Sequence, residues 1–140
     1  MRDSPGEAHR WFDEAGSDLA FARVGHREGF HSKVCFLCQQ GAEKALKAVA
    51  YGDGERYVPG HSLQDLLDRL QTRHPSLDLL RDLCRLLDQY YVPTRYPNAL
   101  PGGVPHRSYT EGQAREAISG CEQVMLAVRE ELRRMQIAVE

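Results

Sequence analysis

The sequence CQQGAEKALKAVA, residues 38–50, decides the expected fold. Its apolar side chains recur at steps of three and four residues, which is the spacing of one side of an α-helix. Together with the preceding turn, this stripe consists of Cys35, Cys38, Ala42, Ala45, Leu46 and Val49. The pattern predicts a helix from Phe30 to Tyr51 that is buried along one side, with Gly52 as the residue that ends it.

A polar stripe lies beside the apolar one on the same helix. It consists of residues at positions i, i+3, i+4 and i+7, namely Gln40, Glu43, Lys44 and Lys47. Two interpretations are open. The stripe is a solvated face in which Glu43 and Lys47 form an ordinary i,i+4 ion pair, or it is one wall of a binding site. Gly41 and Ala42 make this surface shallow, so another helix can approach it closely.

The segments before and after this helix also carry helix signals. Ser4 with Glu7 matches a capping box, and the helix that starts there can end at Gly25. Ser62 can cap a short third helix. Pro75 separates that helix from a fourth, leucine-rich helix predicted over residues 77–90.

The last predicted helix begins after residue 110 and continues without interruption. Thr110 with Gln113 matches a second capping box, and an apolar stripe then continues to Met135. No segment is typical of a strand pair. The sequence therefore predicts an all-α fold, an antiparallel up-and-down helical bundle of four long helices and a short one, in a single domain over residues 1–140.

Composition narrows the class of protein. The formal net charge is −2, which does not indicate a strongly basic nucleic-acid binder. The sequence has neither the apolar run of a membrane span nor a secretory signal, so we expect a cytoplasmic protein that does not enter a membrane. Cys35 and Cys38, with His31 one turn earlier, lack a second ligand pair for zinc, and core packing is the favoured role. No metal or cofactor is predicted.

A proline- and glycine-rich loop, YYVPTRYPNALPGGVPHRSY at residues 90–109, separates the fourth and last helices. It carries Arg95, Tyr96, His106 and Arg107, and residues 89–110 contain no acid. This stretch suits an anion-facing surface. Arg95 has a structural alternative as well, in which an ion pair with Asp88 or Glu43 pins the loop.

At this point the chain resembles a known family. The sequence QQGAEKALKAVAYGDGERYVPGHSLQDLLDRL, residues 39–70, is similar to the HEPN domain, named for nucleotide-binding proteins of higher eukaryotes and prokaryotes. The residues that carry the resemblance are Trp11, Ala15, Asp18, Leu19, Gln40, Glu43, Lys44, Lys47, His61, Leu63 and the RYP of residues 95–97. The resemblance covers roughly residues 11–125. It implies a helical bundle, a homodimer and a minimal nucleotidyltransferase as partner in a toxin–antitoxin-like pair.

The resemblance also implies that some branches of the family are metal-independent ribonucleases, which use an arginine and a histidine with four to six residues between them, near the start of the last helix. Here Arg95 and His106 are separated by ten residues, and positions 100–102 hold Leu, Pro and Gly. A flexible loop can still bring the two side chains together. A ribonuclease that uses Arg95 and His106 is therefore one alternative, and a purely structural dimerisation bundle is another.

The first hypothesis for the function is a binding module for a nucleotide or RNA, associated with a nucleotidyltransferase. The resemblance and the charge pattern give it these candidate residues: Gln40, Glu43, Lys44, Lys47, His61, Arg95, Tyr96 and Arg107. His61 precedes the cap of the short helix. It is either a structural residue at that helix start or a neighbour of the polar stripe in a shared cleft.

Overall fold

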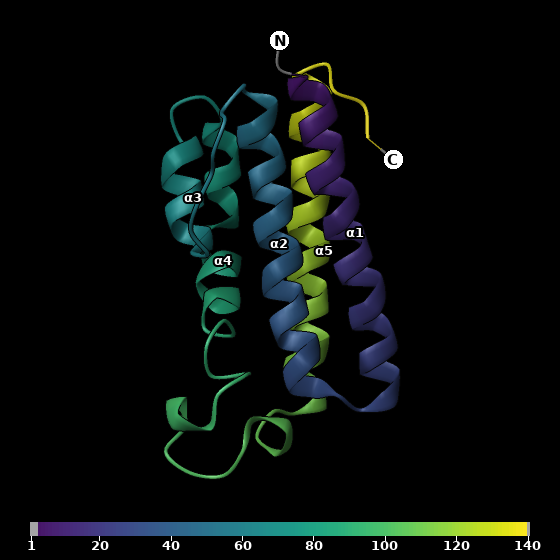
Figure 1. Cartoon of the computed structure of the whole chain (residues 1–140), viewed down its shortest axis with the longest axis vertical. Helices are drawn as coiled ribbons and strands as arrows, with labels where there is room; N and C mark the ends of the chain where they lie inside the picture. The colour runs from purple at the N-terminus through teal and green to yellow at the C-terminus, as the bar shows by residue number, and fades with distance from the viewer. Residues whose placement is uncertain (1–2, 140) are drawn as a thin grey trace.

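The computed structural model describes residues 3–139, and these residues form a bundle of helices without strands. The α-helices are α1 (Ser4–Glu28), α2 (His31–Gly52), α3 (Leu63–Leu70), α4 (Arg81–Asp88) and α5 (Glu111–Arg134). Three short 3-10 helices are η1 (Pro75–Leu80), η2 (Pro97–Ala99) and η3 (Pro105–Arg107). The long helices α1, α2 and α5 lie side by side, α3 and α4 cover one side of α2, and the loop before α5 closes one end (Figure 1).

The all-α bundle predicted from the sequence is confirmed, but the fourth helix is shorter than expected. Its predicted range, 77–90, divides into η1 and the two-turn α4. Pro75 opens this segment, and Pro75–Leu80 forms a 3-10 helix before α4 begins. Beyond Asp88 the hydrogen bonds revert to the shorter i,i+3 pattern, from Tyr90 N–H to the Leu87 carbonyl, and the chain turns.

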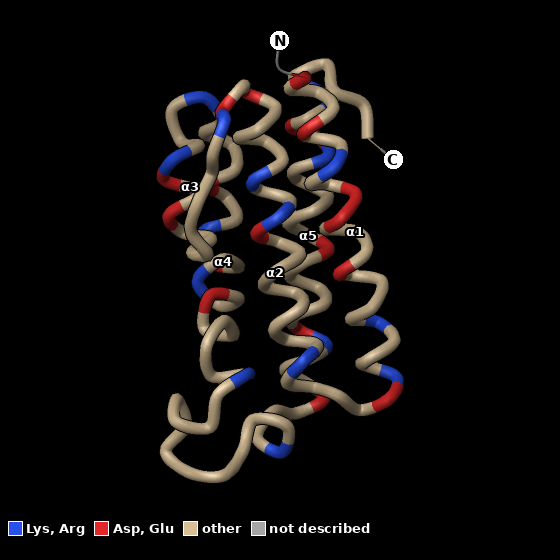
Figure 2. The backbone as a smooth tube through the Cα atoms, viewed as in Figure 1, with Lys and Arg blue, Asp and Glu red and all other residues tan. Residues whose placement is uncertain are grey.

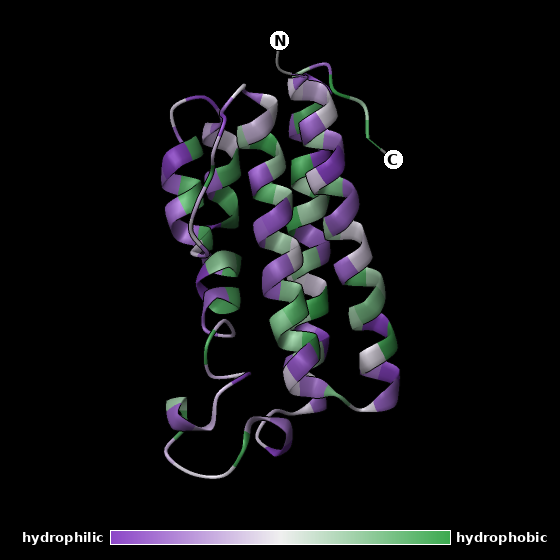
Figure 3. Ribbon diagram, in the orientation of Figure 1, coloured by the Kyte–Doolittle hydropathy of each residue, from purple (hydrophilic) through white to green (hydrophobic). Residues whose placement is uncertain are grey.

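Helix α2 is the centre of the core. Buried apolar residues of α1, α2 and α5 join in one core, and Figure 3 shows hydrophobic segments in green along these helices. Cys35, Cys38 and Cys121 are free thiols with no exposed surface, which confirms their expected packing role. Burial raises the pKa of the Cys35 thiol to about 12, so it stays protonated. Within residues 3–139 no helix is long and apolar enough to cross a membrane.

Gly41 sets how closely three helices approach. A Cβ built at this position would lie 3.0 Å from Cys121 Sγ of α5 and 3.4 Å from the Ala15 carbonyl oxygen of α1. The close approach expected from the Gly41–Ala42 pair is therefore present. A larger side chain would have to push α5 or α1 away from α2.

Two helix ends differ from the sequence expectation. Asp3, not Ser4, caps α1, because its Oδ1 accepts the Gly6 N–H at 2.9 Å. The helix also continues past Gly25 to Glu28. Gly29 ends it with φ of 84°, a left-handed conformation that glycine adopts without steric cost. The Ser62 cap and the Thr110–Gln113 capping box are confirmed.

A buried ionic cluster fastens the other end of the bundle. His74 Nδ1 lies 2.5 Å from Glu131 Oε2 of α5, and His74 Nε2 lies 2.9 Å from Asp53 Oδ2 at the end of α2. Carboxylates only accept hydrogen bonds, so the ring that satisfies both is the doubly protonated imidazolium. Ser76 and Arg134 also donate to Glu131. The buried charges of this cluster link the end of α2, the start of η1 and α5.

Replacing His74 with alanine should lower the free energy of unfolding by about 3 kcal/mol, since removing one partner of a buried ion pair strands the others. Urea denaturation at neutral pH measures the loss. The matched control is Arg73→Ala. The Arg73 side chain is 68% exposed and lies 4.0 Å from Asp53, so its removal should cost less than about 1 kcal/mol. Equal losses in the two variants would contradict a special role for the buried ring.

The cluster also makes stability depend on pH. Burial alone would raise the pKa of Glu131, but hydrogen bonding and charge from His74, with Ser76 and Arg134, hold it below its usual 4.5. A carboxyl group whose pKa is lower in the folded than in the unfolded protein stabilises the fold at pH values above its unfolded pKa. This stabilisation is lost as the pH falls through the folded pKa. The urea concentration at the midpoint of unfolding should therefore fall as the pH is lowered below about 5. The drop should be smaller in Glu131→Gln than in the control Glu130→Gln, whose side chain is exposed.

Candidate functional site

The candidate site lies on the side of α2 that faces α3 and α4, above the loop that leads to α5. A pocket of about 680 Å³ opens there between the start of α3, the end of α4 and the following loop. Its lining includes His61, Asp88, Tyr91, Leu100 and Tyr109. Segments that are far apart in the sequence thus meet at one concave surface.

Glu43 is the buried centre of this site. Its side chain is only 5% exposed, yet three groups contact its carboxylate. Oε2 lies 3.2 Å from Lys47 Nζ, and Oε1 lies 3.1 Å from His61 Nδ1 and 3.2 Å from Gln40 Nε2. The expected Glu43–Lys47 pair exists, but the solvated-face interpretation is wrong, because both side chains are covered by neighbouring elements.

The two lysines of the stripe are held by acids. Lys44 Nζ lies 2.7 Å from Asp18 Oδ2 of α1. Lys47 pairs with Glu43, and its Nζ also lies 5.7 Å from the centre of the Trp11 ring. The two charges therefore join α2 to its neighbours. Neither ammonium group is left as a free positive charge for a ligand.

His61 is the member of the site that reaches solvent. Its side chain is 55% exposed, and its ring stacks on Tyr91 with 4.7 Å between ring centres. Because the ionised Glu43 carboxylate can only accept hydrogen bonds, Nδ1–H of His61 donates to it. The Nε2 atom makes no hydrogen bond to any of residues 3–139. The His61 ring is therefore oriented by Glu43 and Tyr91 and still open on one edge.

Two residues that the sequence interpretation missed hold His61 and α3 in place. Gln39 is fully buried and donates from Nε2 to the His61 carbonyl at 2.7 Å. Asp88, the last residue of α4, accepts the Leu63 N–H at 2.8 Å and the Gln64 N–H at 3.2 Å. The Asp88 carboxylate thereby caps α3 from another helix, which suits its positive N-terminus. No sequence pattern joins residues 25 positions apart, so only the fold reveals this cap.

Arg95 is surrounded by aromatic rings. Its guanidinium carbon lies 4.5 Å from the ring centres of Phe36 and Tyr91 and 5.0 Å from that of Tyr96. Nε donates to the Tyr91 carbonyl at 2.8 Å. The alternative in which Arg95 pairs with Asp88 or Glu43 is wrong, because the α3 N-terminus occupies the first carboxylate and Lys47 and His61 occupy the second. Stacking therefore takes the place of an ion pair.

The Tyr91 ring links the histidine to the arginine. The His61 ring centre lies 4.7 Å from it and the Arg95 guanidinium carbon 4.5 Å from it. The two groups are thus separated by no more than the sum of these distances. An imidazole and a guanidinium therefore pack on the same ring, although 33 intervening residues separate them in the sequence.

The other loop candidates are less constrained. Tyr96 is 49% exposed and precedes η2. His106 and Arg107 belong to η3, are exposed, and form no side-chain hydrogen bond or ion pair with residues 3–139. Unlike His61, His106 thus has no side-chain partner in this part of the chain that orients its ring.

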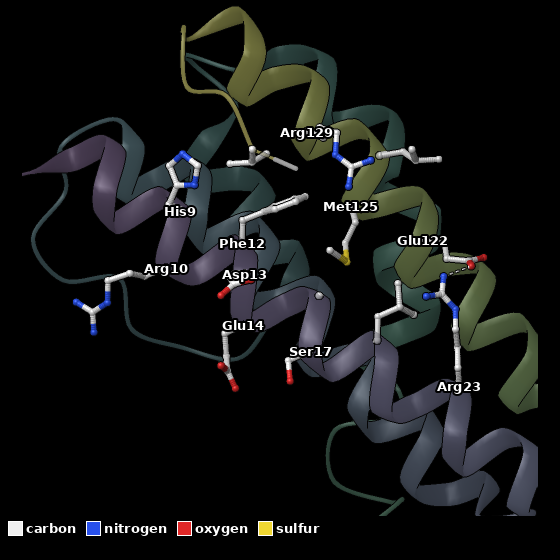
Figure 4. A pocket seen from close by; sticks show the side chains of 14 residues that line it. His9, Arg10, Phe12, Asp13, Glu14, Ser17, Arg23, Glu122, Met125 and Arg129 are labelled. Carbon is white, nitrogen blue, oxygen red and sulfur yellow. Dashed lines mark hydrogen bonds and ion pairs between the residues drawn. The ribbon is translucent and has the colours of Figure 1, made fainter.

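Another groove lies between α1 and α5 and has a volume of about 940 Å³. Figure 4 shows Phe12 and Met125 between the two helices and the Arg23–Glu122 pair, 2.6 Å apart, that joins them. His9 stands on α1 at the far end of this groove (Figure 4). Its charged lining belongs to ion pairs and exposed ends, and it brings together no buried acid with an open histidine. Across residues 3–139, no cluster of His, Cys, Asp and Glu could hold a metal ion.

The comparison with known families decides the identity of the fold. The HEPN domain family matches residues 8–131. The chain belongs to the HEPN domain family. This match runs from within α1 to within α5, and so contains every residue of the pocket wall and of the Arg95 cluster.

Solved structures agree with this HEPN assignment. The protein TT1696 from Thermus thermophilus is 36% identical, with a TM-score of 0.85 over 90% of this chain and 98% of that one. ST0689, an archaeal HEPN homologue, is 32% identical, with a TM-score of 0.75 over 94% and 99%. A HEPN domain protein from Thermotoga maritima is 32% identical, with a TM-score of 0.73 over 90% and 99%. No match was found among curated proteins.

The orientation of His61 can be tested directly in this HEPN chain. Because Glu43 accepts from Nδ1, the neutral His61 ring should carry its proton on Nδ1. Nitrogen-15 NMR of the imidazole ring measures this tautomer. Glu43→Gln should reduce the preference, while the signals of His106, which lacks such a partner, should stay unchanged. An Nε2-protonated His61 in the unmodified protein would contradict the assigned hydrogen bond.

Proposed function

We propose that this HEPN chain binds the phosphate of a nucleotide or an RNA strand at Arg95. The observation that carries the proposal is the stacking of the Arg95 guanidinium on Phe36, Tyr91 and Tyr96. Only Nε is hydrogen-bonded, so both terminal amino groups have no hydrogen-bond partner within residues 3–139. A guanidinium presents these groups as a planar fork that matches two phosphate oxygens.

The surroundings of Arg95 favour an anion. Figure 2 shows basic residues and no acidic ones along the loop between α4 and α5, as the sequence of residues 89–110 requires. A phosphate there meets no nearby carboxylate of the loop itself, and Arg107 adds a further positive charge to this segment. The packed rings also limit the rotamers of Arg95, which reduces the conformational entropy that binding would remove.

The exposed aromatic surface suits the rest of a nucleotide. Tyr96 is half exposed beside the guanidinium, and a nucleobase can stack on such a ring regardless of its sequence. Single-stranded RNA combines phosphates with accessible bases. A nucleotide and a short RNA strand therefore share the chemistry that this surface offers.

Arg95→Ala should weaken binding of a short single-stranded oligoribonucleotide by about tenfold or more, because a charge-assisted hydrogen-bond pair is lost. Arg95→Lys should recover only part of the loss, since an ammonium lacks the planar fork. Fluorescence anisotropy at several salt concentrations measures both effects, and common ribonucleoside triphosphates can serve as competitors.

The control for charge alone is Arg85→Ala. Arg85 is 59% exposed on α4 and pairs with Asp82, away from the aromatic cluster. It should bind RNA as the unmodified protein does, apart from a small salt-dependent effect. If Arg95→Ala and the unmodified protein bind all these ligands equally, the proposed site is wrong.

The partner is part of the same proposal. We expect this chain to act, in the cytoplasm and as a homodimer, with a minimal nucleotidyltransferase in a toxin–antitoxin-like module. Its resemblance to stand-alone HEPN proteins supports this expectation. Phe21 is 65% and Leu126 58% exposed on α1 and α5, so apolar surface is available for a second copy.

Purification from the native host tests the partnership. A tagged chain expressed at its natural level should retain a small nucleotidyltransferase through size-exclusion chromatography, identified by mass spectrometry. Phe21→Glu, which places a charge on the exposed α1 face, tests whether the homodimer uses this surface. Recovery of the chain without any nucleotidyltransferase would contradict the partner assignment and leave the phosphate site to be judged by its own assay.

A further inference from the structure

We infer that the N-terminus of α2 binds a small tetrahedral oxyanion, inorganic phosphate or sulfate, at a site separate from Arg95. Two independent observations support this inference. The helix begins at His31 without a side-chain cap. The side chains of its first two residues, His31 and Ser32, hold covered polar atoms that form no hydrogen bond with residues 3–139. The inference does not depend on the proposed binding of RNA.

The first turn of α2 presents hydrogen-bond donors. Phe30 occupies the N-cap position, but its side chain cannot accept a hydrogen bond. The Val34 N–H donates to the Phe30 carbonyl at 3.0 Å, whereas the N–H groups of His31, Ser32 and Lys33 donate to no atom of residues 3–139. These groups form the positive end of a 22-residue helix, so they favour an anion.

Ser32 supplies the second observation. This residue is only 1% exposed, and its hydroxyl forms no hydrogen bond with residues 3–139. A buried hydroxyl group nearly always has a partner. Side chains on a helix lean toward its N-terminus, so the hydroxyl of the second helical residue is aimed at the end of the first turn. An oxyanion there would accept the hydroxyl proton together with the backbone N–H groups.

His31 adds a further donor next to Ser32. Its Nδ1 atom is buried and has no hydrogen-bond partner among residues 3–139. The nearest aromatic neighbour is the His26 ring, 6.4 Å away between ring centres. With its proton on Nδ1, the imidazole donates to an acceptor. Because this part of the chain supplies none to either residue, the acceptor comes from outside it.

The charges at this end of the bundle also favour an anion. The end of α1, the start of α2 and η3, which packs against α2, meet there (Figure 1), and each carries an exposed cation: Arg27, Lys33 and Arg107. The acids at this end are Glu28 and Glu111. Glu111 lies 2.6 Å from His26 Nε2 and also pairs with Arg115, so its charge is already balanced.

The enclosure selects a small ion. A Cβ built at Gly29, two residues before the helix, would meet no atom within 4 Å beyond its chain neighbours. The approach to the helix end is therefore open, whereas the Ser32 hydroxyl is almost covered. A phosphate or sulfate ion can bring its oxygens to this hydroxyl and to the N–H groups. A strand of RNA, with bases and sugars beside each phosphate, is too wide.

The test is a titration of the full, nitrogen-15-labelled chain with sodium phosphate at constant ionic strength, followed by amide NMR and repeated with sulfate. The amide signals of His31, Ser32 and Lys33 should shift and reach saturation. Ser32→Ala should weaken the binding by about tenfold, which is the usual loss of one hydrogen bond to a charged group.

Lys33→Glu tests the site without changing the core. Lys33 is exposed, and an acid in the first turn favours the helix, so this variant should fold. Its carboxylate repels the ion, and the saturable shifts should disappear. The matched control is Arg133→Glu, which makes the same change in net charge at the other end of the bundle, where Arg133 is 64% exposed. It should bind phosphate as the unmodified chain does.

Three results would overturn the inference. The first is a shift that stays linear with phosphate and sulfate, or an equal affinity in Ser32→Ala and the unmodified chain. The second is a shift of these amides by an oligoribonucleotide but by neither ion. The third is a loss of phosphate binding in Arg95→Ala, since the ion would then occupy Arg95. RNA binding at Arg95 is measured by its own assay, so either proposal can fail while the other stands.

Discussion

The buried carboxylate of Glu43 is the constraint on which the candidate site depends. A charge that leaves water must find charged or hydrogen-bonding partners, because the interior does not replace its hydration otherwise. Glu43 finds Lys47 on its own helix, Gln40 one turn earlier and His61 from the segment before α3. Through these contacts a single side chain on the central helix fixes the position of a distant histidine.

The end of α4 continues this arrangement. Asp88 caps α3, which fixes the helix start next to His61, and three residues later Tyr91 provides the ring on which both His61 and Arg95 pack. The first arginine of the loop, Arg95, is therefore held close to the end of α4. Ionic contacts hold His61 and α3, and aromatic contacts hold Arg95. Because the carboxylates of Asp88 and Glu43 are occupied, the guanidinium can only stack or meet an external anion.

Local sequence rules succeeded where the interaction partners are close in the chain. The caps at Ser62 and at Thr110 with Gln113 were predicted because a side chain and the N–H that it accepts lie three residues apart. The apolar stripes of α2 and α5 were predicted because helical periodicity is local. The errors at the ends of α1 are also local in kind. Asp3 and Ser4 are both good caps, and Gly25 and Gly29 both end helices well, so adjacent signals competed.

The site itself was only partly visible in the sequence. His61, Glu43 and Arg95 were named as candidates, whereas the cap from Asp88, the support from Gln39 and the shared Tyr91 ring were not. By itself the sequence determined the all-α class, the approximate helices and the family, because these follow from periodicity and from motifs of neighbouring residues. The tertiary structure alone decided that Glu43 and Lys47 are buried and that Arg95 stacks on rings without an acid partner. It did so because burial and pairing depend on which distant segments pack together, and that packing is settled only when the helices assemble.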